Sequence, residues 1–225
     1  MQNPTNHPIQ TVCLAIDAPG ALSLAERVLR RGHLVAFPTD TVYGVGAHAF
    51  LPQAVAQLYQ VKGRPAQLPI PLLLPDAAAM ATICADIPSL AWDLAEHFWP
   101  GGLSLVLHRS PRVPDAVTTG GDTVAVRVPD QPFVRELCHL LEAPLAATSA
   151  NRHGRPSPIL ADEVRASLGG RIHLLLDGGP CPGGTASTVL DLTRSPPAIL
   201  RSGPVTAEEL EETIASQDAV FSKDV

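Results

Sequence analysis

The stretch GDTVAVRVPD, residues 121–130, alternates strictly between valine and smaller or polar residues. Successive side chains of a β-strand point to opposite faces, so the three valines predict the buried face of a strand. The opposite face carries Thr123 and Arg127, with the small Ala125 between them. An arginine there suits a carboxylate or phosphate ligand, because its planar fork donates parallel hydrogen bonds. A half-solvated sheet face explains the alternation equally well.

Helical and extended patterns alternate on both sides of this strand. The spacing of apolar residues predicts helices over 21–31, 52–61, 90–98, 133–141, 161–168 and 207–214, the last opened by a Thr206–Glu209 capping box. Strands are predicted over 33–37, 70–74, 103–107, 123–128, 145–148, 172–176, 188–192 and 198–201. This alternation predicts an α/β sheet covered by helices. We expect one domain over 9–215, with flexible termini at 1–8 and 216–225.

Composition narrows the class of protein. Hydrophobic residues make up 45% of the 225 residues and charged residues 17%, which is typical of a globular chain. The net charge of −6 disfavours a protein that coats nucleic acid, so we expect no stable nucleic-acid binding. The most apolar segment, 68–87, is interrupted by prolines and aspartates, which excludes a membrane span there. Four dispersed cysteines without a CxxC pair indicate free thiols in the cytoplasm.

The stretch FPTDTVYGVGAHA, residues 37–49, follows a predicted strand with hydroxyl groups and two glycines. The Thr41 hydroxyl can hydrogen-bond a polar ligand, and Gly44 and Gly46 would let the backbone approach it. An ordinary turn followed by a loop is the alternative interpretation.

The stretch VKGRP, residues 61–65, contains one of the two lysines of a chain that has fourteen arginines among its 16 basic residues. In extended backbone Lys62 and Arg64 would share a face, and two such cations suit a polyphosphate. The alternative is a solvated basic helix end, where cations are also favourable. The sequence has no Walker motif.

The stretch LAATSANRHGRPSP, residues 145–158, ends a predicted strand of small residues. Ser149 and Asn151, two positions apart, would share a face, and the following loop carries Ser157. Ser187 begins another predicted strand, and Arg201 ends the last one. The sequence contains no GxSxG, GxGxxG or HExxH motif, so we predict no resident metal site.

Taken together and in order, these motifs resemble the YrdC-like threonylcarbamoyl-AMP synthase family over residues 9–211. The resemblance is carried by K-x-R and S-x-N (Lys62, Arg64, Ser149, Asn151), PTDTVYG, PGG at 100–102, TVAVRVP, TSAN-x-x-G-x-PSP, LDGG at 176–179, STV and LR-x-G at 200–203. The family implies a YrdC-like open, twisted mixed sheet with flanking helices and a concave ligand cleft.

The resemblance also implies an activity, that of a nucleotidyltransferase. Family members use ATP with its Mg²⁺, L-threonine and bicarbonate or CO₂ to form threonylcarbamoyl-adenylate and pyrophosphate. The product then passes to a tRNA threonylcarbamoyl transferase for modification of tRNA. Two alternatives stay open, namely an RNA-binding module and a carbamoyltransferase domain that uses carbamoyl-adenylate without threonine.

By the same resemblance, the site residues fall into two groups. The ATP site would comprise Lys62, Arg64, Thr123, Ser149, Asn151, Ser157 and Arg201, with catalysis assigned to Lys62 and Arg64. Threonine would be held by Thr41, Arg127, Ala147 and Ser187. The chain departs from many relatives at Leu68 and Leu73, positions that are often polar. We also expect the short, single-domain form of the family, without the second domain that some relatives carry.

Overall fold

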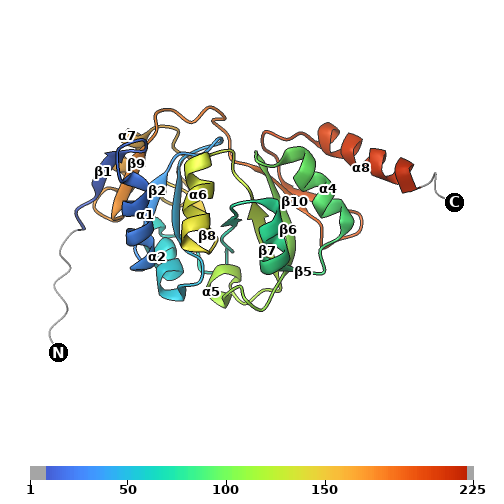
Figure 1. The fold of residues 1–225 in the computed structure, drawn as a ribbon, viewed down its shortest axis with the longest axis horizontal. Helices are drawn as coiled ribbons and strands as arrows, with labels where there is room; N and C mark the ends of the chain where they lie inside the picture. The colour runs from blue at the N-terminus through green and yellow to red at the C-terminus, as the bar shows by residue number, and fades with distance from the viewer. Residues whose placement is uncertain (1–8, 222–225) are drawn as a thin grey trace.

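The computed structural model describes residues 9–221, which form one mixed β-sheet flanked by helices (Figure 1). The strands are β1 (Val12–Ala15), β2 (Val35–Phe37), β3 (Gly44–His48), β4 (Leu72–Leu73), β5 (Cys84–Ala85), β6 (Leu103–Arg109), β7 (Thr123–Arg127), β8 (Leu145–Ser149), β9 (Leu174–Asp177), β10 (Thr188–Asp191) and β11 (Ala198–Arg201). The helices are α1 (Ala21–Arg30), α2 (Pro52–Lys62), the 3₁₀ turn η1 (Ala77–Ala79), α3 (Met80–Ile83), α4 (Ser89–Phe98), α5 (Asp115–Thr118), α6 (Pro132–Leu141), α7 (Ala161–Leu168) and α8 (Ala207–Phe221).

The sheet interleaves strands from distant parts of the chain. Neighbouring strands follow the order β1-β9-β2-β3-β8-β4-β7-β6-β10-β11, and β5 pairs with β6 beside this path. The sheet contains parallel pairs such as β4–β7 and β6–β10 as well as antiparallel pairs such as β3–β8 and β6–β7. The predicted α/β class, an open mixed sheet with flanking helices, is confirmed.

Strand alternation divides the core into two layers. In β2, Val35 and Phe37 pack with α1 and α6, whereas Ala36 faces the larger cluster on the other side of the sheet. Helix α1 contributes Ala21, Ala25 and Leu29, which lie four residues apart and form one buried stripe. Strand β2 is therefore covered on both faces, whereas Thr123 and Ala125 of β7 stay partly exposed on the face that also carries Arg127.

The glycines of the PTDTVYGVG stretch serve the sheet. Gly44 and Gly46 lie in strand β3, where no strand was predicted, and the alternative of a turn followed by a loop is wrong for residues 44–48. A Cβ atom at either position would lie 3.0 Å from the ring of Phe37 on the neighbouring strand β2. The glycines therefore make room for a core aromatic ring, and their predicted role in backbone approach to a ligand is wrong.

Several element bounds match the sequence predictions closely. Helix α7 and strand β11 have the predicted bounds, and Thr206 and Glu209 exchange the hydrogen bonds of a capping box. Helix α8 continues to Phe221, past the predicted end at 214. Residues 1–8 and 222–225, predicted as flexible, lie outside the described residues. The single-domain extent and the flexibility of 216–221 stay predictions.

None of the helices within residues 9–221 is both long and apolar enough to cross a membrane.

Candidate active site

A cleft with a cavity volume of about 240 Å³ is lined by Leu73 of β4, Arg127 of β7 and residues 147–149 of β8, among others. It contains eight of the eleven predicted site residues, which reach it from six separate segments of the chain: Thr41, Arg64, Arg127, Ala147, Ser149, Ser157, Ser187 and Arg201. Three predicted residues do not line this cleft, namely Lys62, Thr123 and Asn151. The sheet thus brings together most of what the sequence motifs singled out.

Arg127 is the centre of the most connected part of the cleft. Strand β7 delivers it, with 6% of its surface exposed. Its Nη2 donates to both carboxylate oxygens of Asp40 at 2.6 and 2.7 Å, Nη1 donates to Thr41 Oγ1 at 3.0 Å, and Nε donates to the Gly101 carbonyl at 2.8 Å. A guanidinium has five N–H groups, so these four contacts leave one without a partner among the described residues. That group can still bind a ligand carboxylate.

Ser187 joins a second set of contacts in the same part of the cleft. Its hydroxyl lies 2.9 Å from the hydroxyl of Ser104 and accepts a hydrogen bond from Arg201 Nη2 at 3.0 Å. Arg201 Nε also donates to the Ser187 carbonyl at 2.9 Å. Gly203 allows this packing, since a Cβ there would lie 2.4 Å from the Ala186 carbonyl oxygen. We call Thr41, Ser104, Arg127, Ser187 and Arg201 the networked wall.

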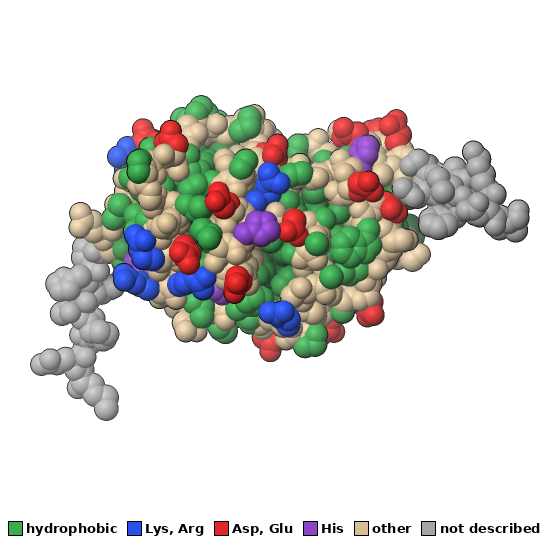
Figure 2. Space-filling model, in the orientation of Figure 1, with side chains coloured by type: hydrophobic (Ala, Val, Ile, Leu, Met, Phe, Trp, Pro, Cys, Tyr) green, Lys and Arg blue, Asp and Glu red, His purple; other side chains and the backbone are tan. Residues whose placement is uncertain are grey.

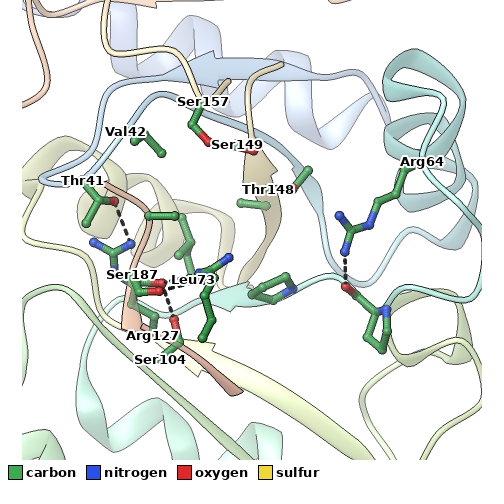
Figure 3. Close-up of a pocket in the computed structure, with 15 residues that line it drawn as sticks. Thr41, Val42, Arg64, Leu73, Ser104, Arg127, Thr148, Ser149, Ser157 and Ser187 are labelled. Atoms are coloured by element: carbon green, nitrogen blue, oxygen red, sulfur yellow. Dashed lines mark hydrogen bonds between the residues drawn. The ribbon is translucent and has the colours of Figure 1, made fainter. Parts of the chain in front are cut away.

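The other side of the cleft is formed by Arg64, Ser149 and Ser157, which we call the open wall. Figure 3 shows Arg64 across the cleft from Thr41, Arg127 and Ser187. Its guanidinium donates to the carbonyls of Leu68 at 3.2 Å and Pro69 at 2.8 Å, and it has no carboxylate partner among the described residues. The Arg64 side chain is therefore held by main-chain carbonyls.

The charged side chains that line the cleft are all positive. Arg64, Arg127 and Arg201 line it, whereas no carboxylate from residues 9–221 does. Within the same residues, the one ion pair made by these arginines joins Arg127 to Asp40. Loss of solvation, followed by the positive charges of Arg127 and Arg64, lowers the pKa of Arg201. Arg201 thus lies close enough to Arg64 and to Arg127 to be repelled by both. A polyanion bound between the two walls would relieve that repulsion.

Lys62 occupies an unexpected place. It ends helix α2, and Gly63 follows it with a left-handed φ of 60°, so the predicted extended backbone shared with Arg64 is wrong. Only 3% of Lys62 is exposed, and its Nζ donates to the carbonyls of Ser149 and Asn151. Burial, followed by the charge of Arg64, lowers the pKa of Lys62 to about 8. The solvated-helix-end alternative is also wrong, because the ammonium group is buried.

The remaining predicted residues lie away from the cleft surface. Asn151 is 6% exposed and donates from Nδ2 to the carbonyls of Arg152 and Arg155. Thr123 begins strand β7 opposite His108, at the other end of the strand from Arg127. Neither residue lines this cleft, and the parts assigned to Thr123 and Asn151 in ATP binding stay predictions.

Two residues were not predicted from the sequence: Ser104 of the networked wall, and Asp40, the carboxylate partner of Arg127. Asp40 lies in the quoted PTDT motif, and an acid between two threonines was the available signal. Ser104 lies in strand β6, where a hydroxyl interrupts an apolar strand directly after the PGG turn. Of the two departures from many relatives, Leu73 lines the cleft, whereas Leu68 is 39% exposed and contributes its carbonyl to Arg64.

Comparison with known proteins shows the family to which the chain belongs. The family model Sua5_yciO_yrdC, described as "Telomere recombination", matches residues 27–203. The chain belongs to the Sua5/YciO/YrdC family. Curated relatives include the threonylcarbamoyl-AMP synthase of Pyrococcus abyssi, 43% identical over 91% of this chain and 61% of the relative. The protein of the same name from Bacillus subtilis is 42% identical over 86% of this chain and 56% of the relative.

A solved structure of the same family agrees with the fold described above. The structure of Pyrococcus abyssi Sua5 complexed with L-threonine has a TM-score of 0.86 and is 43% identical, covering 92% of this chain and 60% of that chain. The chain thus spans about 60% of the length of these first relatives. The resemblance to the YrdC-like family, stated from sequence motifs, is confirmed.

Proposed function

We propose that this chain is a nucleotidyltransferase that makes L-threonylcarbamoyl-adenylate from ATP, L-threonine and bicarbonate or CO₂, with release of pyrophosphate. The observation that carries the proposal is the cleft itself. Among the described residues, Arg64 and Arg201 lack acidic partners there, and Arg127 keeps one N–H without a partner. Such a site suits a polyphosphate and a carboxylate side by side. The names of the relatives, and the L-threonine bound in the Pyrococcus abyssi structure, support the same assignment.

The proposed reaction needs positioning and charge neutralisation. The carbamate of threonine attacks the α-phosphorus, an oxygen–phosphorus bond forms, and the bond to the departing pyrophosphate breaks in line. Arg64 and Arg201 neutralise charge that grows on the phosphates. Arg127 binds the threonine carboxylate, and the hydroxyls of Thr41 and Ser187 orient the amino acid. The carbamate is already an anion, so no general base is required.

The accessory components of the proposal follow from the same cleft. Mg²⁺ enters with ATP, and we assign its coordination to the phosphates because the cleft-lining residues include no carboxylate. Bound in this way, the ion neutralises phosphate charge. We place the reaction in the cytoplasm and its product with a tRNA threonylcarbamoyl transferase. The unpaired state of all four cysteines agrees with a reducing compartment.

The surface charge argues against the RNA-binding alternative. On the face shown in Figure 2, basic side chains are interspersed with acidic ones and form no continuous stripe. Together with the net charge of −6, this surface offers little attraction for a nucleic-acid backbone.

The decisive assay measures pyrophosphate release from ATP, with threonine and bicarbonate each omitted in turn. We expect release to require both, and Arg64→Ala to lower it about 100-fold, as the loss of a transition-state donor does. Arg171→Ala, which removes an exposed arginine outside the cleft, serves as the matched control and should keep full activity. Release that ignores threonine, or that survives Arg64→Ala unchanged, would refute the proposed function.

A further inference from the structure

The side chain of Lys62 connects helix α2 to the turn that follows strand β8. Its Nζ donates to the carbonyl of Ser149 and, at 2.5 Å, to the carbonyl of Asn151. The main chain returns a third hydrogen bond, from the His153 N–H to the Lys62 carbonyl at 2.8 Å. The end of α2 and the turn at residues 149–153 are thereby joined into one unit.

Asn151 holds the same turn from inside. Its Nδ2 donates to the carbonyls of Arg152, at 3.0 Å, and Arg155, which closes the loop over four residues. Its Oδ1 is buried without a hydrogen-bond partner among the described residues. A buried, unpaired acceptor costs free energy, so the stabilising contribution of this side chain comes from the two bonds that it donates.

These contacts determine what the turn presents to the cleft. Carbonyl oxygens carry partial negative charge and repel phosphate, whereas hydroxyl groups can donate to it. Lys62 binds two carbonyl oxygens of the turn from a position that does not line the cleft. Ser149 and Ser157 lie on either side of residues 150–156, and both residues line the cleft.

We propose that Lys62 and Asn151 are positioning residues that fix the turn at 149–155, and that neither contacts the nucleotide. The inference rests on the proposed function, since the nucleotide is the ATP of that reaction. Arg64 and Ser149 then bind the phosphates directly. Each of the two predicted pairs thus contains one residue that contacts the ligand and one that holds the turn in place. In K-x-R these are Arg64 and Lys62, and in S-x-N they are Ser149 and Asn151.

The first test measures amide hydrogen exchange in the nucleotide-free, full-length chain. Lys62→Met, which keeps an unbranched side chain without N–H donors, should speed exchange within 149–156 about tenfold or more. Arg64→Met, the matched control two residues away, should leave exchange in that segment unchanged. Equal exchange in wild type and Lys62→Met would overturn the proposal.

The second test asks whether Lys62 positions the turn or contacts the phosphates directly. It measures the dissociation constant for MgATP in a double-mutant cycle. Lys62→Met should weaken binding about tenfold in the wild-type chain and less than about threefold when Ser149 is already alanine. Arg64→Met should weaken MgATP binding by the same factor in the Ser149→Ala background as in the wild-type chain. A Lys62→Met factor that is the same in both backgrounds would show direct contact and refute the positioning role.

Asn151→Ala provides an independent variant where Lys62→Met does not fold. It should accelerate exchange over 152–156 and lose its effect on MgATP binding in the Ser149→Ala background. Additive effects there would overturn the proposal. Failure of the proposed function would appear elsewhere, as wild-type pyrophosphate release that does not depend on threonine, while the exchange measurements would still report on the turn.

Discussion

The two walls of the cleft hold their side chains in different ways. Side chains of the networked wall bind one another, and its Arg127 is also paired with a carboxylate and a main-chain carbonyl. In the open wall, Arg64 contacts only main-chain carbonyls, and Ser149 is placed by contacts to its backbone. The difference indicates that the proposed threonine ligands Thr41, Arg127 and Ser187 are held in place before ligand arrives, together with Arg201. Of the proposed phosphate ligands, Arg64 and Ser149 lack such contacts between side chains among the described residues.

The sharpest way to break this comparison is to remove Arg127. Arg127→Met should lower the free energy of unfolding by about 3 kcal/mol, because Asp40 loses its partner, and should lower threonine-dependent turnover at least ~100-fold. Urea unfolding and pyrophosphate release measure the two effects. The double variant Arg127→Met/Asp40→Asn should recover much of the stability and none of the activity. Equal stability of the single and double variants would contradict the paired arrangement.

A milder comparison uses one serine from each wall. Ser187→Ala leaves Arg201 and Ser104 without their hydroxyl partner, so we expect a loss of about 1–2 kcal/mol in unfolding free energy and about a tenfold higher KM for threonine. Ser157→Ala, the matched change in the open wall, should alter stability by less than ~0.5 kcal/mol and raise the KM for ATP only. Similar stability losses in both variants would remove the distinction between the walls.

The smallest expected effect concerns pH. The pKa of Lys62 falls from 10.5 to about 8 on folding, chiefly through burial. Between pH 8 and 10.5 the unfolded chain therefore binds more protons at this site, so Lys62 should make stability rise with pH. The urea concentration at the midpoint of unfolding is measured from pH 7.5 to 9 in wild type and in Lys62→Met. Over this range it should rise more steeply, or fall less, in wild type than in the variant.

The difference between the two proteins isolates Lys62 in that experiment. Burial raises the pKa of Cys84 and of Cys138 to about 12, and both thiols contribute equally to wild type and variant. Identical pH slopes in the two proteins would contradict the buried ammonium group.

The fold could be predicted wherever side-chain periodicity was clear. The valines of β7 and the apolar stripe of α1 each identified an element and its buried face. Strand β3 was missed because its glycines match turn chemistry, while their real cause, the ring of Phe37, lies on another strand. Such tertiary causes leave no local pattern.

The sequence predicted most of the residues that form the site, but not how their side chains are directed. Motif order selected eight residues that share one cleft. The direction of Lys62 could not be foreseen, because it depends on α2 ending at that residue and on the left-handed turn at Gly63. The pairing of Asp40 with Arg127, 87 positions apart, depends likewise on the completed sheet.

The strand order has a consequence for synthesis on the ribosome. Strand β9 lies between β1 and β2, and β11, which carries Arg201, pairs with β10 beside β6. A nascent chain that has emerged only through β8 therefore lacks Ser187 and Arg201, and β1 and β2 still await the strand that joins them. Because domains are made from the N-terminus onward, nucleotide binding should begin only late in translation.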